Sequence, residues 1–227
     1  FMVCWFMQAP PAQAALTSFP AGSIIVPMDP CWQPNNDTAV TSAFRPTGCE
    51  TTKSDRGIFQ AYGMVYEMLR NGANVAWVVK PSKIEENQFD LSIAGVLDAA
   101  TSQIVPPVAR YIRTGTNTNI DPPARTFNWT ASDGTALSES FAAHVIDYRG
   151  GPFIIHKKFL NATMLAILDN FQNVKVHVAN VSFTAPIDKV LDKLPPKLAI
   201  LGGNNTAILR DYLLAAGLGT SGSLVFE

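Results

Sequence analysis

The chain has 227 residues, of which 47% are apolar and 15% are charged, and its formal net charge is −1. This is the composition of a folded domain with a sizeable core. Lysine and arginine form no cluster, so we expect no nucleic acid and no anionic membrane surface as a partner. The sequence shows neither a dinucleotide fingerprint nor a P-loop, and we expect no cofactor.

The first residues have the pattern of an export signal. The apolar run 1–7 is followed by a Pro-Pro break and by Ala12-Gln13-Ala14, which has the small-x-small form of a signal-peptidase site. We therefore interpret residues 1–14 as a signal peptide, trimmed at its N-terminus because it lacks an initial methionine and a charged region. No later segment reaches the roughly 20 apolar residues that a membrane span needs. The expected location is secreted, periplasmic or at the cell surface, with no membrane span in the mature chain.

Residues 15–227 are expected to form a single domain. Residues 223–227 resemble a strand that stops as it begins, so we expect the domain to be truncated at its C-terminus. Cys31 and Cys49 remain in one loop after removal of the signal, and in an exported protein such a pair favours a disulfide. A free thiol pair and half of a metal site are the alternatives.

The first half of the chain predicts a β-α-β unit. Residues 23–28 (SIIVPM) are a short β-branched run, and residues 57–72 place apolar side chains at helical spacing before an Asn-Gly stop. Residues 74–80 (NVAWVVK) are mostly apolar without alternation, which is typical of a strand in a sheet covered on both faces. We expect the two strands to be parallel and joined by a right-handed crossover.

The middle of the chain is less regular. Residues 89–94 favour a strand, and residues 93–102 favour a helix. The polar stretch at about 114–140 contains paired prolines, and we expect it to be an irregular, exposed insertion.

Strands and helices alternate again after the insertion. Residues 144–148 and 152–155 flank Arg149-Gly150-Gly151 and predict a hairpin or a kinked strand. The remaining predicted elements are a helix (159–171), a strand (174–181), a short helix (185–194), a strand (197–201) and a helix (205–216). This alternation predicts an α/β three-layer sandwich with a mostly parallel sheet.

The first candidate for a ligand site is the turn in KLAILGGNNTAILR. Gly202 and Gly203 stand between a predicted strand and a predicted helix, where the N–H groups of the helix start are free to receive an anion or a polar ligand. Asn204, Asn205 and Thr206 add polar side chains there. The alternative is structural: the glycines make the turn, and one asparagine caps the helix.

Two further candidates are Asp29 and the turn Arg149-Gly150-Gly151. Asp29 follows the first strand at its carboxyl end, where open α/β sheets place their binding crevice. It is either a general base or metal ligand, or the cap of a turn. Arg149 either clamps a carboxylate or is an exposed charge on a turn.

The histidines, serines and cysteines show no catalytic signature. His144 and His156 bracket the Arg149 turn without the HxH or HExxH spacing of a metal site, and His177 lies opposite the valines of its strand. Each histidine is either structural or part of a site. The chain has no G-x-S-x-G elbow, and a bridged cysteine pair leaves no thiolate nucleophile. We predict no metal site and assign no catalytic residue.

Five segments carry a resemblance to known proteins: FPAGSIIVPMD, GIFQAYGMVYEMLRNG, NVAWVVKPSK, YRGGPFII and PPKLAILGGNNTAILRDYLLAAGL. Together they resemble uncharacterised exported bacterial proteins whose later part looks like the class I glutamine amidotransferase-like, flavodoxin-like α/β fold. The resemblance implies that fold. Enzymes of that family carry a cysteine on a sharp strand-to-helix turn, whereas the best such turn here carries glycine and asparagine. The resemblance therefore does not imply glutaminase activity.

These observations lead to one expected function and two alternatives. We expect a secreted, non-catalytic or degenerate module that binds an unknown small molecule or surface partner at the carboxyl edge of its sheet. The first alternative is an extracellular hydrolase that uses Asp29 and the Arg149 turn, with or without His156. The second is a structural part of a larger surface protein.

Overall fold

The computed structural model describes residues 15–28, 33, 57–85, 88–100, 102–111, 145–171, 174–195 and 206–218. Its helices are α1 (Gly57–Arg70), α3 (Ala162–Asn170) and α4 (Thr206–Ala215), with a short 3-10 helix at Lys157–Phe159. Its strands are β1 (Ala15–Phe19), β2 (Ile24–Val26), β3 (Val75–Val78), β4 (Leu91–Ala94), β5 (Val96–Asp98), β6 (Gln103–Val105), β7 (Val108–Arg110), β8 (Val145–Tyr148), β9 (Phe153–Ile155), β10 (His177–Ala179) and β11 (Phe183–Leu191).

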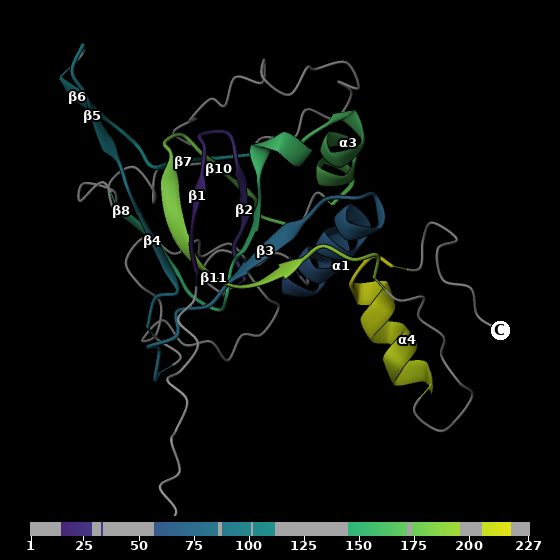
Figure 1. The fold of residues 1–227 in the computed structure, drawn as a ribbon. Helices are drawn as coiled ribbons and strands as arrows, with labels where there is room; N and C mark the ends of the chain where they lie inside the picture. Colours follow the sequence, from purple (N-terminus) through teal and green to yellow (C-terminus); the bar gives the residue numbers. More distant parts are fainter. Residues whose placement is uncertain are drawn as a thin grey trace, which may run out of the picture.

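These elements form three layers. Figure 1 shows a central sheet with α1 and α3 on one side and the two-stranded ribbon of β4 and β8 on the other. The hairpin of β5 and β6 extends beyond this ribbon, and α4 lies beyond α1. No helix in the described residues is long and apolar enough to cross a membrane.

The central sheet is antiparallel throughout. Its strand order is β1-β11-β3-β9-β2-β10-β7, and every neighbouring pair is antiparallel. The predicted mostly parallel, flavodoxin-like sandwich is therefore wrong. β2 and β3 do run in the same direction, but β9 lies between them and pairs with both. A run of apolar residues shows that both faces of a strand are covered, and it does not show which way the neighbouring strands run.

Two β-α-β units interlock in this sheet. β9 lies between the strands of the unit β2-α1-β3, and β2 lies between the strands of the unit β9-α3-β10. This is the split β-α-β-β-α-β arrangement of ferredoxin-like folds. β7 extends it beyond β10, and β11 and β1 extend it beyond β3.

The sheet separates two apolar cores. On the helix side, Ile24, Val26 and Ile155 pack with buried residues of α1 and α3. On the ribbon side, Ile25 and Ile154 pack with Leu91, Ile93, Ile146 and Tyr148 of the ribbon. Successive residues of β2 thus enter opposite cores, as the alternation of side chains along a strand requires.

Two predicted helices are strands. Residues 93–102 contain β5, and residues 185–194 fall largely in β11. In β11, Phe183, Ala185 and Ile187 alternate toward the ribbon side. A shift of register between Ile187 and Lys189 then turns Leu191 to the helix side. This bulge breaks the two-residue period, so the apolar spacing imitates that of a helix.

The predicted helices around α1, α3 and α4 are confirmed, and their ends follow known capping rules. Gly72 and Gly217 have φ of 86° and 76°, and each follows its helix in a Schellman arrangement of hydrogen bonds. At the start of α3, the Asn161 side chain accepts a hydrogen bond from the Met164 N–H at 3.0 Å.

A glycine allows α4 to lie close to α1. A Cβ atom on Gly63 would lie 1.7 Å from the carbonyl oxygen of Ala216, just after α4. The Phe59 and Tyr212 rings also meet, with centroids 5.5 Å apart. Because Tyr212 meets Phe59 and Ala216 meets Gly63, the first turns of α4 extend past the N-terminal end of α1.

We expect Gly63→Ala to lower the free energy of unfolding by about 1–3 kcal/mol, the usual cost of overpacking. Urea denaturation would measure this change, and hydrogen exchange would show loss of protection in α4. Gly72→Ala is the control, because a Cβ there meets nothing within 4 Å. It should cost about 1 kcal/mol for its left-handed backbone and leave α4 protected. A stabilised Gly63→Ala protein, as in an unhindered helix, would contradict this account.

Candidate functional site

The predicted site turn Arg149-Gly150-Gly151 joins the ribbon to the sheet. β8 pairs with β4 in the ribbon and β9 pairs with β2 and β3 in the sheet, so the chain changes layers between Tyr148 and Phe153. Gly150 and Gly151 both have φ of 70°, a left-handed conformation that glycine adopts most easily. The expected hairpin or kinked strand is thus a crossing between two sheets.

A buried carboxylate holds this crossing. Asp90 is 3% exposed and immediately precedes β4. Its Oδ2 accepts hydrogen bonds from the Gly151 N–H at 3.0 Å and from Lys83 Nζ at 2.8 Å. Its Oδ1 accepts from the Lys80 N–H at 3.2 Å. The carboxylate therefore connects the segment after β3, the start of β4 and the turn before β9.

Gly151 is enclosed from the other side by Trp77. The indole N–H of Trp77 donates to the Gly151 carbonyl oxygen at 3.0 Å, and a Cβ on Gly151 would lie 2.5 Å from that nitrogen. Arg149 lies on the ring of Phe89, with Cζ 4.7 Å from the ring centroid, in cation–π contact. The N–H group of Gly151 is thus hydrogen-bonded to Asp90, and its carbonyl oxygen is hydrogen-bonded to Trp77.

The other predicted site residues lie mostly outside the described part of the chain. These are Asp29, Cys31, Cys49, Gly202, Gly203, Asn204 and Asn205. The insertion at about 114–140 and residues 1–14 also lie outside it. Thr206 is the first residue of α4, and its side chain is not described.

Two described segments, the end of β2 and helix α4, lie toward the same end of the sheet. Val26 pairs with Phe153, so Met28 continues toward the end where the Gly151 turn lies. α4 packs against the N-terminal half of α1, which begins at that end because α1 runs toward the start of β3. The Arg149 turn and the carboxyl end of β2 thus lie at the same end of the sheet, and the predicted site there stays a prediction because Asp29 and residues 202–205 lie outside the described residues.

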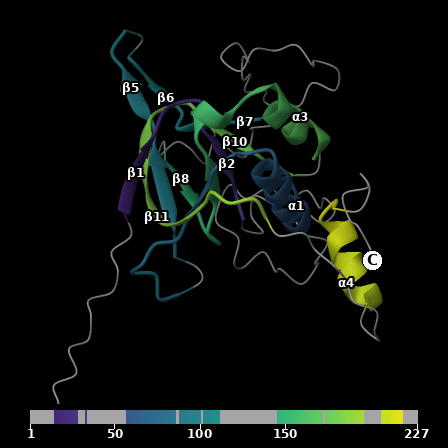
Figure 2. The ribbon, with the colours of Figure 1, turned by 45° about the vertical axis from the view of Figure 1, so that its right-hand side comes forward.

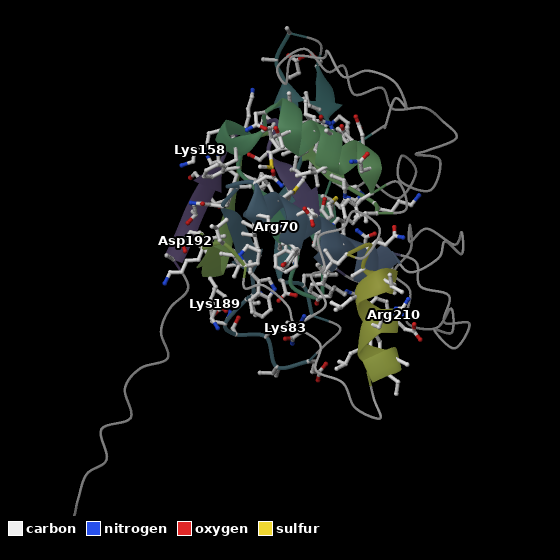
Figure 3. The ribbon with its side chains drawn as sticks, turned by 90° about the vertical axis from the view of Figure 1, so that its right-hand side faces the viewer. Arg70, Lys83, Lys158, Lys189, Asp192 and Arg210 are labelled. Atoms are coloured by element: carbon white, nitrogen blue, oxygen red, sulfur yellow. The ribbon has the colours of Figure 1, made fainter. Side chains whose placement is uncertain are left out.

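His156 lies far from that turn. It follows β9, whereas Gly151 precedes it, so an extended strand of about 3.3 Å per residue separates them by roughly 16 Å. Figure 3 likewise shows Lys158, two residues after His156, far from Lys83, which binds Asp90. The structure therefore does not bring His156 and Arg149 together, so His156 is not the optional third group of the hydrolase alternative.

Each described histidine contacts a structural partner. His156 Nδ1 accepts a hydrogen bond from the Lys158 N–H at 3.0 Å and caps the 3-10 helix. His177 is buried in the ribbon-side core, with Nδ1 2.8 Å from the Tyr148 hydroxyl oxygen. His144 lies outside the described residues. Across the described ranges, no group of three or more His, Cys, Asp or Glu could hold a metal ion.

Sequence reasoning missed Asp90, Lys83 and Trp77. Asp90 stands alone between Phe89 and Leu91, and a single acidic residue inside an apolar run is a signal that its carboxylate is paired in the core. The pairing of Tyr148 with His177 left no comparable signal, because the two residues come from different sheets.

Comparison of the chain with protein-family models, with curated proteins and with solved structures found no match. No relative therefore transfers a function to these residues.

We expect Asp90→Asn to lower the free energy of unfolding by about 2–4 kcal/mol, because it removes the ion pair with Lys83 and replaces one acceptor oxygen with an NH₂ group that cannot accept from the buried donors. Guanidinium denaturation would measure the loss. Lys83→Met removes only the charged side-chain donor and should cost less, because the N–H groups of Lys80 and Gly151 still donate to Asp90. Equal losses of stability in the two variants would show that the ion pair alone holds the crossing between the ribbon and the sheet.

The cap at His156 predicts a pH-dependent stability. Burial lowers the pKa of His156 below its ordinary 6.5, and the nearby charge of Lys158 lowers it further. The unfolded chain thus binds the proton more readily, so stability should fall as pH drops below 6.5. His156→Asn keeps a capping acceptor that does not titrate, and it should flatten this part of the dependence between pH 7.5 and 5.5. An unchanged slope in urea denaturation would exclude His156 as the source.

Proposed function

We propose that this chain is an exported, non-catalytic module that binds another polypeptide through the hairpin of β5 and β6. The observation that carries the proposal is the exposure of apolar side chains on this hairpin. Leu97 is 64% exposed, and it lies directly opposite Ile104, which is 38% exposed. Val96 is also exposed.

The hairpin lacks the support that an isolated pair of strands needs. β5 and β6 form a separate two-stranded sheet, and such a hairpin is only marginally stable in water without a further strand or a packed face. Val105 at its base packs against the ribbon-side core. Leu97 and Ile104 form the next pair toward the turn. Figure 2 shows that the hairpin extends beyond the body of the molecule. A partner that covers them would supply the missing packed face.

The hairpin chemistry favours an apolar cleft on the partner. Among its described side chains Asp98 carries the only charge, and that carboxylate accepts a hydrogen bond from the Ala100 N–H within the turn. Exposed apolar side chains gathered on a projecting element are typical of protein–protein contacts. The export pattern of residues 1–14 and the resemblance to exported bacterial proteins support a partner outside the cytoplasm.

The chemistry of the described polar groups agrees with a binding role. Asp90 accepts hydrogen bonds from three residues in two segments, His156 caps a 3-10 helix, and Asp169 accepts from the Tyr111 hydroxyl at 2.9 Å. These groups have structural tasks, whereas Val96 and Leu97 of the hairpin are mostly exposed.

We expect a photoreactive amino acid at Leu97 to form one discrete crosslink to another polypeptide in the exporting cell. The matched control is the same amino acid at Ile84, which is 85% exposed and belongs to the segment between β3 and β4. With Ile104→Ser added, the Leu97 crosslink should weaken about tenfold, as for loss of a central apolar contact. Thermal stability should hardly change, because both side chains are exposed.

The partner identified by this crosslink would then be purified and titrated with the wild-type chain and with the Ile104→Ser variant. Binding by the wild type and loss in the variant would support the proposal. The same crosslinks from Leu97 and Ile84, or equal affinity of both proteins, would contradict it.

A further inference from the structure

The two edges of the central sheet differ in their protection against further pairing. At one edge, β7 has three residues, ends in Arg110 and follows Pro106 and Pro107. Short strands, prolines and charges are the usual devices that prevent strands from adding to an edge. At the other edge, β1 (ALTSF) has five residues with no charge and no proline. Among the described residues no strand pairs with its outer side.

β1 is held firmly on its inner side. Its five residues pair with β11 in one unbroken register, from Ala15 with Ile187 to Phe19 with Phe183. Phe19 is 4% exposed, and its ring stacks on Phe183 with centroids 5.4 Å apart. The strand is therefore a fixed template, and its outer backbone groups are ordered before any partner arrives.

The pairing also shows which residues of β1 face outward. In an antiparallel ladder, alternate residues exchange both backbone hydrogen bonds with one neighbour, and the residues between them point away. Leu16 is opposite Pro186, which has no N–H and cannot complete such an exchange. The bonded positions are thus Ala15, Thr17 and Phe19. Leu16 and Ser18 direct their N–H and C=O groups to the outer edge.

We propose that the outer edge of β1 is an interface between two copies of this chain, which pair antiparallel about a two-fold axis at Thr17. Leu16 and Ser18 are equally spaced about Thr17, so Leu16 of each copy exchanges both backbone hydrogen bonds with Ser18 of the other. Thr17 then lies opposite its own counterpart, and threonine pairs are favourable across strands.

The side chains of β1 agree with a second copy as the occupant. Leu16 is 75% exposed, although strand residues of its kind are usually packed. In the two-fold pairing the Leu16 side chains of both copies lie on the same face as diagonal neighbours, so each reduces the exposure of the other. No side chain of the strand is charged, so no like side-chain charges oppose one another. The result is one antiparallel sheet that continues across both copies.

The expected dimer is weak and depends on concentration. A five-residue strand edge buries less than the roughly 1,200 Å² of a stable interface, so its dissociation constant should be on the order of 10–100 μM. Sedimentation velocity of the full chain over a range of concentrations would measure it.

Charge at the two-fold axis provides the decisive test. Thr17→Lys places two lysines opposite each other and should weaken the dimer at least about tenfold, and Thr17→Glu should do the same. A mixture of the two variants should regain dimers, because opposite charges then meet. Thr184→Lys, on the inner strand β11, carries the same charge away from the edge and should leave the dimer unchanged. Circular dichroism melts would check that every variant is folded.

Three outcomes would overturn the proposal. A wild-type chain that stays monomeric up to about 1 mM, far above the expected dissociation constant, shows that the edge does not pair with itself. A Thr17→Lys protein that dimerises like the wild type places the interface elsewhere. A monomeric wild type whose edge instead binds an added strand peptide identifies another polypeptide as the occupant. Loss of the dimer by these variants does not depend on the hairpin of β5 and β6, so the proposed function is tested separately.

Discussion

The buried carboxylate of Asp90 determines how the two β layers meet. A carboxylate that leaves water is stable in the interior only when donors satisfy it, and its donors come from Lys80, Lys83 and Gly151. These residues lie after β3 and before β9, while Asp90 itself begins the ribbon. All these segments must therefore be in place together. The docking of the ribbon and the entry of β9 into the sheet are coupled through one side chain.

This coupling explains why the fold departs from a simple ferredoxin-like arrangement. Two helices cover only one face of such a sheet, which would leave Ile25, Ile154 and Val78 exposed on the other. The chain between β3 and β9 supplies the missing cover, because it contains β4 and β8, whose apolar residues face that side. It must then return to the centre of the sheet, and the glycine turn held by Asp90 makes that return.

The sequence predicted local structure well and strand direction poorly, for a physical reason. The spacing of apolar residues predicted α1, and the Asn-Gly pair predicted its C-terminal cap at Gly72, because both signals lie within the helix or next to it in the sequence. The apolar strands correctly reported a sheet covered on both faces. They could not report that β9, about 75 residues later in the chain, inserts between β2 and β3. The bulge in β11 interrupted the two-residue period, so the sequence pattern there predicted a helix.

Of the candidate site, the sequence correctly predicted a turn at Gly151. It did not predict that Asp90 binds this turn, because the two residues are 61 positions apart in the chain.

Within the described part of the chain, the positions of the polar groups indicate where other molecules can be recognised. Inside the fold, Asp90 and His177 are paired by neighbours from other segments, and a ligand would have to displace those contacts at considerable cost. At the periphery, the β5–β6 hairpin and the outer edge of β1 present apolar side chains and backbone groups that need no displacement. Recognition at these places uses shape and main-chain hydrogen bonds, which depend on the fold more than on any catalytic side chain. Among the described residues, the paired polar groups of the interior and the uncharged edge strand β1 are therefore the observations on which the two proposals of binding between polypeptides rest.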